Sequence, residues 1–366
     1  MSFKTIIYKL FSCINYYYYP TTLTRETKTV LQDRYRVSFT PEEIDFLKKS
    51  AATFDYHTDY TDGYWQKALY TVRLAKVTLL GNSGALVKQN KVIAESTFDA
   101  GRLGISPAYR SPAVMWNRHK PGLYTSVFHL PWAETSNFHW FYDCLPRVYI
   151  LLQQVKEPVK LIVNQNLPAF QLETLQFVIT DYPHITVVYQ PKTAKWEIEH
   201  FIFPGFVTNH SSGFLPARIA HFLREKIWQG YQVQPQNAKT RLYISRSKAR
   251  KRRILNENML TEELVKLGFI IVHAEDLTYA QQVQLFYNAA IIVAPHGAGL
   301  TNILFSKHCR VLELHPADIM KPHYFLAAKA LSFDYFYEMG SKADANLDFT
   351  VNVEEILKKY KMLLST

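Results

Sequence analysis

A glycine-rich segment with the sequence PHGAGLTN occupies residues 295–302, directly after the apolar run AIIVAP. Its glycines let the backbone approach a ligand closely, and the helix predicted after it would present N–H groups to an anion. A tight turn around a hydrogen-bonded histidine is the equal alternative, because a short glycine motif is a weak signal. The candidate ligand-contacting residues are His296, Gly297, Ala298, Gly299, Leu300, Thr301 and Asn302. The last two could also cap the helix.

A basic segment lies upstream at residues 241–257 (RLYISRSKARKRRILNE), where a predicted strand passes into a predicted helix. Arginine side chains bind phosphate oxygens in bidentate geometry, so a phosphate-bearing ligand is one interpretation. A solvated basic loop or a nucleic-acid patch is the other, because the cations cannot all face one ligand. The segment contains Arg241, Arg246, Lys248, Arg250, Lys251, Arg252 and Arg253.

A third segment, NFHWFYDCLPR at residues 137–147, carries groups that can move a proton. On a helix, His139 and Asp143 share one face because they are four residues apart, and Arg147 follows four residues later. A carboxylate in this setting could act as general base towards a hydroxyl group. An amphipathic helix with a surface ion pair is the equal alternative.

Alternating strands and helices must position these three segments. From residue 70 the pattern gives strands at 72–81, 85–90 and 91–96, separated by hairpin turn residues. From about residue 137, short apolar runs alternate with amphipathic ones as far as residue 339. This alternation predicts an α/β fold with parallel sheets, which bind ligands outside the carboxyl ends of their strands.

A polar stretch at residues 232–240 is predicted to link two domains. An N-terminal helical and hairpin extension is expected at residues 1–70, with a helix that starts at the sequence TPEE, residues 40–43. Two Rossmann-like domains are expected at residues 71–231 and 241–345, and a C-terminal helix at residues 346–366.

The composition of this 366-residue chain fits a folded protein with an anionic partner. Its 48% hydrophobic and 20% charged residues exclude a disordered chain, and its net charge of +11 favours phosphates, nucleic acid or an acidic membrane. Cys13, Cys144 and Cys309 show neither a disulfide framework nor metal-ligand spacing, which favours a reducing compartment. Residues 1–20 are too short and interrupted for a membrane-spanning helix and lack a cleavage site. An ordinary helix or a membrane-touching basic-aromatic segment is expected there.

The sequences NFHWFYDCLPR, YISRSKARKRRILNE and PHGAGLTN, in this order, resemble the motifs of glycosyltransferase family 61. The hairpin at residues 78–96 is similar to the family's early hairpin, and the resemblance spans about residues 73–337. Bacterial members are often described as capsular polysaccharide biosynthesis proteins, and relatives include the extracellular O-linked N-acetylglucosamine transferase and plant xylosyltransferases. The resemblance implies a GT-B-like fold, in which two Rossmann-like domains face a cleft, and an inverting transfer from a nucleotide sugar.

The resemblance also implies residue roles. The first domain would hold the acceptor and the C-terminal domain the donor. Asn256 and Glu257 match an Asn-Glu pair of the family, with helix capping as the alternative to ligand contact, and Gln282 is a further family position. Many members read Asn-Phe/Tyr-x-His in the first motif, whereas this chain reads Asn137-Phe138-His139, so the role of His139 stays open. The implied donor-binding residues are Arg246, Arg250, Arg252, Arg253, Glu275 and the loop at 296–302, and the acceptor-side residues are Asn137, Trp140 and Arg147.

The expected reaction is an in-line displacement at the anomeric carbon by an acceptor hydroxyl. Asp143 is our first choice for the general base and His139 the second. The chain has no Asp-x-Asp motif, so fixed positive charge is expected to replace Mg²⁺, with no metal site and no cofactor besides a UDP-sugar donor.

A glycan or glycolipid acceptor is the expected partner, in the synthesis of capsule, lipopolysaccharide or another surface polysaccharide, with no nucleic acid. The expected location is cytoplasmic, with contact to the inner membrane face. Two alternatives stay open: a non-catalytic protein that binds RNA or an acidic glycan through the Arg/Lys cluster, and a degenerate family member that acts as a scaffold.

Overall fold

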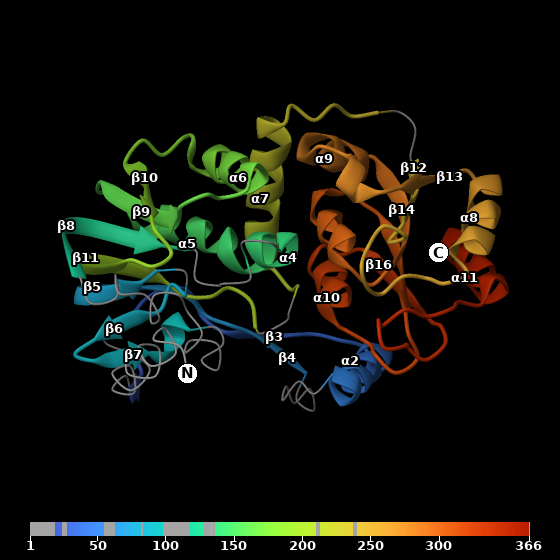
Figure 1. Ribbon diagram of the computed structural model, residues 1–366, viewed down its shortest axis with the longest axis horizontal. Helices are drawn as coiled ribbons and strands as arrows, with labels where there is room; N and C mark the ends of the chain where they lie inside the picture. The colour runs from blue at the N-terminus through green and yellow to red at the C-terminus, as the bar shows by residue number, and fades with distance from the viewer. Residues whose placement is uncertain are drawn as a thin grey trace, which may run out of the picture. The chain divides into compact units, whose positions relative to one another are not determined.

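The computed structural model describes residues 19–23, 28–54, 63–81, 83–97, 117–127, 133, 136–209, 213–236 and 240–365. The segment at residues 1–18, for which a helix or a membrane contact is predicted, lies outside this range. The chain divides into two compact units: Met1–Tyr35 with Lys67–His210, and Arg36–Gln66 with Ser211–Thr366. Each unit combines helices and strands, as the sequence predicts (Figure 1).

The second unit is built around a parallel sheet of five strands within its described residues. The strands are β12 (Thr240–Ile244), β13 (Phe269–Val272), β14 (Ala289–Pro295), β15 (Arg310–His315) and β16 (Asp334–Met339). Between and after them lie α8 (Glu257–Lys266), η7 (Ala274–Asp276), α9 (Tyr279–Tyr287), η8 (Ala298–Phe305), α10 (His323–Ala330) and α11 (Val353–Ser365). The predicted alternation of strands and helices is therefore confirmed from residue 240 to residue 339.

The strand order β13-β12-β14-β15-β16 determines where a ligand can bind. The chain first adds β13 on one side of β12 and then adds the later strands on the other side. The loops that leave β12 and β14 therefore diverge to opposite faces of the sheet, which makes their carboxyl ends a topological switch point. The basic segment follows β12 and the glycine-rich loop follows β14, so both predicted ligand segments begin at this point.

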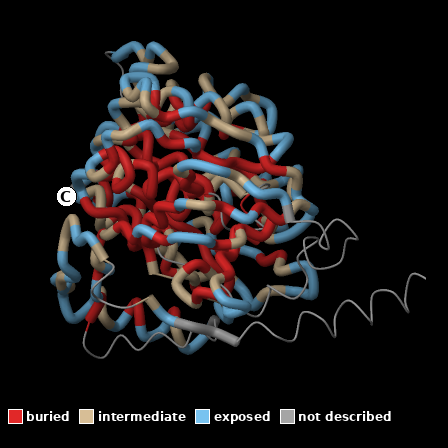
Figure 2. Tube along the Cα trace, turned by 90° about the vertical axis from the view of Figure 1, so that its left-hand side faces the viewer, coloured by how far each residue is buried: buried red, intermediate tan, exposed pale blue. Residues whose placement is uncertain are grey.

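Apolar packing holds the sheet from both faces. On one face, strand residues such as Tyr243 and Val293 pack against Leu260 of α8 and Ile356 of α11. Elsewhere in this unit, Phe46 packs against Phe325 of α10. Figure 2 shows this burial along the chain, with buried residues in red and exposed residues in pale blue.

Helix α2 (Pro41–Phe54), which contains Phe46, starts where the sequence predicts a helix. The Thr40 backbone N–H donates to Glu43 at 2.8 Å, and the Glu43 N–H donates to the Thr40 hydroxyl at 3.3 Å. This reciprocal pair is a capping box, which fixes the first turn. The second unit also contains a short sheet of β3 (Tyr35–Val37) with β4 (Tyr64–Gln66), and α7 (Ala217–Gly230). Helices α2 and α7 thus lie in a different unit from the domains predicted for them.

The first unit contains a mixed sheet of nine strands among the described residues. These are β1 (Tyr19–Thr21), β2 (Lys28–Gln32), β5 (Leu69–Leu80), β6 (Leu86–Lys88), β7 (Lys91–Ile93), β8 (Asn117–Ser126), β9 (Val159–Asn164), β10 (Ile185–Gln190) and β11 (Lys195–Pro204). Strands β5, β6 and β7 form the predicted antiparallel hairpins, whereas β11, β8, β9 and β10 run parallel. A wholly Rossmann-like sheet is therefore not what the described residues form here, and the GT-B arrangement stays a prediction.

The predicted helical segment around residue 146 is confirmed as two pieces. A short helix α4 (Asn137–His139) continues into a π-helical turn, η6 (Trp140–Cys144), and α5 (Pro146–Gln154) follows. Helix α6 (Ala169–Ile179) connects β9 to β10, and a 3-10 turn, η3 (Ala94–Ser96), follows β7. No helix among the described residues is long and apolar enough to cross a membrane.

Candidate functional site

The glycine-rich loop lies against an arginine from the basic segment. A Cβ atom at Gly297 would come within 2.2 Å of Nη1 of Arg246, so only glycine leaves room for this guanidinium. The φ angle of Gly297 is 177°, which any residue adopts, so the requirement is for space and not for backbone freedom. At Gly299, a Cβ would lie 2.7 Å from Cγ2 of Ile244, so this glycine lets the loop pack on β12.

Buried hydrogen bonds from Glu257 position Arg246. The Glu257 carboxylate accepts hydrogen bonds from the hydroxyls of Tyr243 at 2.8 Å and Ser245 at 2.9 Å, and from the Arg246 backbone N–H at 3.4 Å. The family-implied Asn-Glu pair is thus structural here: Asn256 exchanges hydrogen bonds with the Val351 backbone and makes no side-chain cap. These bonds fix the end of β12, from which the arginine side chain extends.

Three cations gather beside the loop, and we call Arg246, Arg252 and Lys321 the cation cluster. Burial and the charge of Arg252 lower the pKa of Arg246. Burial and the same Arg252 lower the pKa of Lys321 to about 8. Arg252 has a φ of 62°, a left-handed conformation that is costly for a residue with a side chain. Like charges held together in a half-buried place are the arrangement expected of an anion-binding site.

One nitrogen of the Arg246 side chain is buried without a hydrogen-bond acceptor. Nη2 of Arg246 donates to the Lys251 carbonyl at 3.0 Å, but its Nε is buried and makes no hydrogen bond within the described structure. Buried N–H groups are rarely left without an acceptor unless a ligand or water supplies one. Glu275, on η7, is close enough to raise the pKa of Arg246, which fits its expected place near the donor site.

His296 is the loop residue that meets a buried carboxylate. Its Nδ1 lies 2.5 Å from Oε1 of Glu313 on β15, and both side chains are buried. The Tyr335 hydroxyl donates to Oε2 of Glu313 at 2.7 Å, and Nε2 of His315 lies 3.6 Å from the same atom. Burial lowers the pKa of His296 to about 3, so its imidazole is neutral at pH 7 with its Nδ1–H directed at Glu313. Burial alone would raise the pKa of Glu313, but the two histidines lower it and keep the carboxylate ionised.

His296, Glu313 and His315 also form a group of potential metal ligands in the described part of the chain, with ligand atoms within 4.8 Å of one another. The 2.5 Å separation of His296 Nδ1 and Glu313 Oε1 is that of a hydrogen bond. Two ligand atoms at metal-ligand distances from one ion lie about 3 Å or more apart. In the structure as it stands, the geometry is therefore that of a carboxylate that orients a histidine.

Several predicted donor residues have structural partners instead. Arg253 donates through Nε and Nη2 to Oδ2 of Asp348 at 2.9 and 2.6 Å, which turns it away from the cation cluster. Thr301 and Asn302 are fully buried inside η8 and do not cap it, because the N-cap position is Gly297 and no side chain caps there. The prediction that they cap a helix is wrong for this reason.

The remaining donor-side predictions divide between packing and exposure. Asn302 bonds to Gln282 at 2.8 Å and accepts from Tyr279 at 2.9 Å, which ties η8 to α9. Leu300 is buried in the core, and Arg250 is exposed. Gln282, for which a ligand contact is implied, also donates to the Ala274 carbonyl at 2.8 Å.

In the first unit, the predicted pairing of His139 with Asp143 is present. Nδ1 of His139 lies 2.6 Å from Oδ2 of Asp143, and the hydroxyl of Thr208 donates to Oδ1. The Asp143 side chain is 1% exposed and that of His139 is 24% exposed. The π-helical turn makes the Leu145 N–H donate to the Trp140 carbonyl at 2.8 Å, and such turns occur frequently at functional sites. Asp143 thus has both oxygens occupied, while the imidazole reaches the surface.

The residues expected on the acceptor side differ in accessibility. Trp140 is fully buried and its indole N–H donates to Thr174 at 2.9 Å, so it anchors the turn to α6. Arg147 is fully buried, donates to the carbonyls of Pro204 and Val127, and has its pKa lowered to about 9 by burial. Both therefore correct the expectation of ligand-facing side chains. Asn137, which is partly exposed, is the one that a ligand could reach.

Two site residues were missed from the sequence. Glu313 carried a detectable signal, because it is a charged residue within the apolar strand RVLELH. Lys321 carried none, since it lies in the loop between β15 and α10 and its neighbourhood depends on the folded sheet.

The second unit is therefore an α/β unit with a parallel sheet and a group of cations at the carboxyl edge of that sheet. The family whose model matches is Glycosyltransferase 61, over residues 138–312, a stretch that contains His139, Asp143, Arg246 and His296. The resemblance to glycosyltransferase family 61 is thus confirmed over residues 138–312.

Three curated proteins are similar to part of the chain. Protein O-linked-mannose beta-1,4-N-acetylglucosaminyltransferase 2 is 34% identical in Bos taurus, 33% in Homo sapiens and 32% in Mus musculus, each over 111 residues. The match covers 29% of this chain and 19% of each relative, so it spans about a fifth of their length.

Proposed function

We propose that this protein is an inverting glycosyltransferase that moves a sugar from a nucleotide-sugar donor, a UDP-sugar, to a hydroxyl of a glycan acceptor. The observation that carries the proposal is the guanidinium of Arg246 against Gly297, with Arg252 and Lys321 nearby, at the carboxyl ends of β12 and β14. The family match and the glycosyltransferase names of the relatives support the same role. A GT-B-like arrangement of the two units is part of this proposal.

In this proposal the cation cluster binds the donor diphosphate. The leaving diphosphate gains negative charge as its bond to the anomeric carbon breaks, and fixed cations stabilise that charge without reorganising. The buried Nε of Arg246 then obtains its missing acceptor from a phosphate oxygen. Because three cations supply the charge, we propose a reaction that continues in the presence of EDTA.

His139 is the better choice for the general base, and Asp143 is the residue that orients it. A base must reach the acceptor hydroxyl, and of the pair His139 is the more exposed. Asp143 is almost fully buried and holds Nδ1 of His139 at 2.6 Å, which leaves Nε2 as the atom directed to other groups. This assignment reverses our order of preference from the sequence.

Donor binding is tested with the full chain and UDP by calorimetry. Arg246→Ala should weaken UDP binding by about 10- to 100-fold, the value of a charge-assisted hydrogen bond to an anion. Lys248→Ala is the matched control, because Lys248 lies in the same basic segment but is exposed and paired with Asp276. Equal UDP affinity of wild type and Arg246→Ala would refute the assignment of the donor site.

The base is tested by turnover with a panel of nucleotide sugars and glycan acceptors. His139→Gln should lower kcat by about 100-fold or more with little change in donor KM, whereas Asp143→Asn should retain more activity. If His139→Gln turns over normally while Asp143→Asn is inactive, Asp143 is the base.

The acceptor and location follow from charge alone and are part of the proposal. The net charge of +11 suits a lipid-linked glycan at an acidic inner membrane face, as in surface polysaccharide synthesis. A protein that only binds an anionic polymer would instead show RNA or acidic-glycan binding that falls steeply with salt, and no sugar transfer from any donor.

A further inference from the structure

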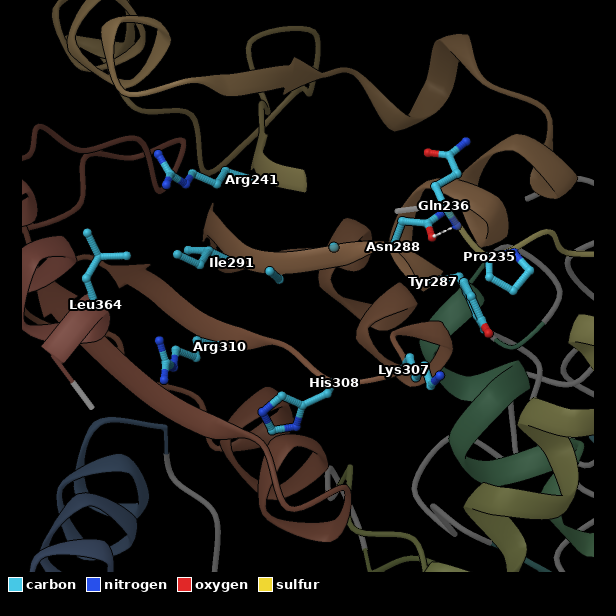
Figure 3. Close-up of a pocket in the computed structure, with 12 residues that line it drawn as sticks. Pro235, Gln236, Arg241, Tyr287, Asn288, Ile291, Lys307, His308, Arg310 and Leu364 are labelled. Carbon is cyan, nitrogen blue, oxygen red and sulfur yellow. Dashed lines mark hydrogen bonds between the residues drawn. The ribbon is translucent and has the colours of Figure 1, made fainter. Parts of the chain in front are cut away.

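A second basic cavity lies at the opposite edge of the sheet in the second unit. It has a volume of about 640 Å³ and is found where β12, β14 and β15 begin. Figure 3 shows the side chains that line it. Arg246 and His296 follow the other ends of β12 and β14. We call it the amino-edge pocket. Its lining includes Arg241, Tyr287, Ile291, Lys307, Arg310 and Leu364.

Two arginines of the amino-edge pocket are placed by strand register. Arg241 on β12 and Arg310 on β15 are both register partners of Ile291, on the strand between them. Register partners in a parallel sheet have side chains on the same face, so both arginines leave the face on which Ile291 packs. Figure 3 shows their guanidinium groups on either side of Ile291. With neighbouring strands about 4.8 Å apart, their backbones lie roughly 10 Å apart, which suits two side chains that converge on one ligand.

The charge of this pocket is one-sided. Four of its lining residues carry basic side chains: Arg241, Lys307, His308 and Arg310. No aspartate or glutamate is among the described residues that line it. Arg310 uses Nε for a 3.3 Å pair with Asp334, which lies outside the lining, and Arg241 uses Nη1 for the Leu267 carbonyl at 2.5 Å. Each guanidinium has five N–H donors, so each keeps donors for an anion.

The rest of the lining suggests a ligand with more than a single charged group. Ile291 and Leu364 give an apolar surface between and beside the arginines, and Tyr287 adds an aromatic ring towards the other end. Asn288 accepts from the Gln236 backbone N–H at 3.0 Å, which fixes an amide at that end. A bare inorganic ion would use only a small part of this space.

We propose that the amino-edge pocket is a second anion-binding site, separate from the donor site, that takes a phosphate-bearing ligand on Arg241, Arg310 and Lys307. Phosphate suits paired guanidiniums because each can make two parallel hydrogen bonds to its oxygens. The phosphate can belong to a soluble molecule or to a lipid head group. The site does not depend on the transferase activity, since none of its lining residues lies in the cation cluster.

The experiment titrates the full chain with inorganic pyrophosphate by calorimetry, with Arg246→Ala as background so that the donor site contributes little. Arg310→Gln combined with Lys307→Gln should weaken pyrophosphate binding by about tenfold or more. Asp334→Asn should leave binding unchanged or tighten it, because it removes the carboxylate that competes for Arg310. Arg241 is not substituted, since it also holds the end of α8. Lys266→Gln, an exposed lysine outside the pocket, is the matched control.

A second arm replaces pyrophosphate with vesicles that contain phosphatidic acid, in a flotation assay with the same variants. If the double variant loses only vesicle binding, the ligand is a lipid phosphate; if it loses only pyrophosphate binding, the ligand is soluble. The proposal is overturned if the folded double variant binds both probes as its Arg246→Ala parent does, or if that parent binds neither.

Discussion

Replacing Lys321 by methionine should make the protein more stable and, at the same time, weaken its binding of UDP. Lys321 lies next to Arg252 in a half-buried place, and its pKa falls from 10.5 to about 8. Because the pKa is lower in the folded chain than in the unfolded chain, the protonated lysine destabilises the fold below pH 8. This loss of stability disappears as the pH rises from 8 towards 10.5. In that range Lys321 is deprotonated in the folded chain but still protonated in the unfolded chain, so the free energy of unfolding increases with pH.

The magnitude follows from the shift in pKa. A decrease from 10.5 to about 8 corresponds to roughly 3 kcal/mol at pH 7, and residual solvent screening reduces this to about 2 kcal/mol. Lys321→Met should therefore raise the free energy of unfolding by about 2 kcal/mol at pH 7 and by less than about 1 kcal/mol at pH 10. UDP binding should weaken by about 10- to 100-fold, because a cation is lost from the phosphate site.

Denaturant unfolding at pH 7 and pH 10, with and without UDP, measures both effects. UDP should stabilise the wild type but not the variant, since only a ligand that binds the folded state shifts unfolding. Lys329→Met is the control: Lys329 is also a partly buried lysine of the second unit, and its ion pair with Glu43 at 2.8 Å means that its loss should not stabilise the fold. A Lys321→Met protein that is less stable than the wild type at pH 7, yet binds UDP normally, would refute the reasoning.

Two further predictions concern the loop. Gly297→Ala should weaken UDP binding by about tenfold or more with little loss of stability, because the new methyl group displaces the flexible end of the Arg246 side chain. Gly299→Ala should mainly lower the thermal midpoint, because its methyl group meets the packed side chain of Ile244 on β12. Calorimetry and thermal unfolding of both variants separate the two effects. Glu313→Gln should weaken UDP binding, since His296, in the loop beside the cation cluster, loses the carboxylate that fixes its tautomer; a variant with only a lower thermal midpoint would show that Glu313 is merely structural.

The strand pattern of the second unit could be predicted because its information is local. Short runs such as AIIVAP are apolar throughout, which is typical of strands buried on both faces. The contact between His139 and Asp143 could also be predicted, because it depends only on their spacing of four residues along the chain. The prediction is correct although the turn is π-helical. Strand β8 was missed because its sequence, NRHKPGLYTS, is polar and contains proline and glycine.

The roles of the arginines could not be predicted because they depend on distant partners. Arg253 is held by Asp348, a residue 95 positions later, and nothing in the basic segment distinguishes it from Arg252. The burial of Lys321 depends in the same way on the loops around the sheet. Sequence patterns therefore predicted the two segments that meet at this edge of the sheet but could not assign the individual cations.

The cation cluster is also where this fold departs from what stability alone would select. Arg252 adopts a left-handed backbone, Arg246 leaves a buried Nε without an acceptor, and Lys321 carries a charge that burial opposes. Each feature costs free energy, and a bound anion would offset the last two, by giving Nε of Arg246 an acceptor and Lys321 an opposite charge. The diphosphate of our proposal would therefore bind where the fold holds these costs, whereas the side chains of a solvated basic loop would turn into water.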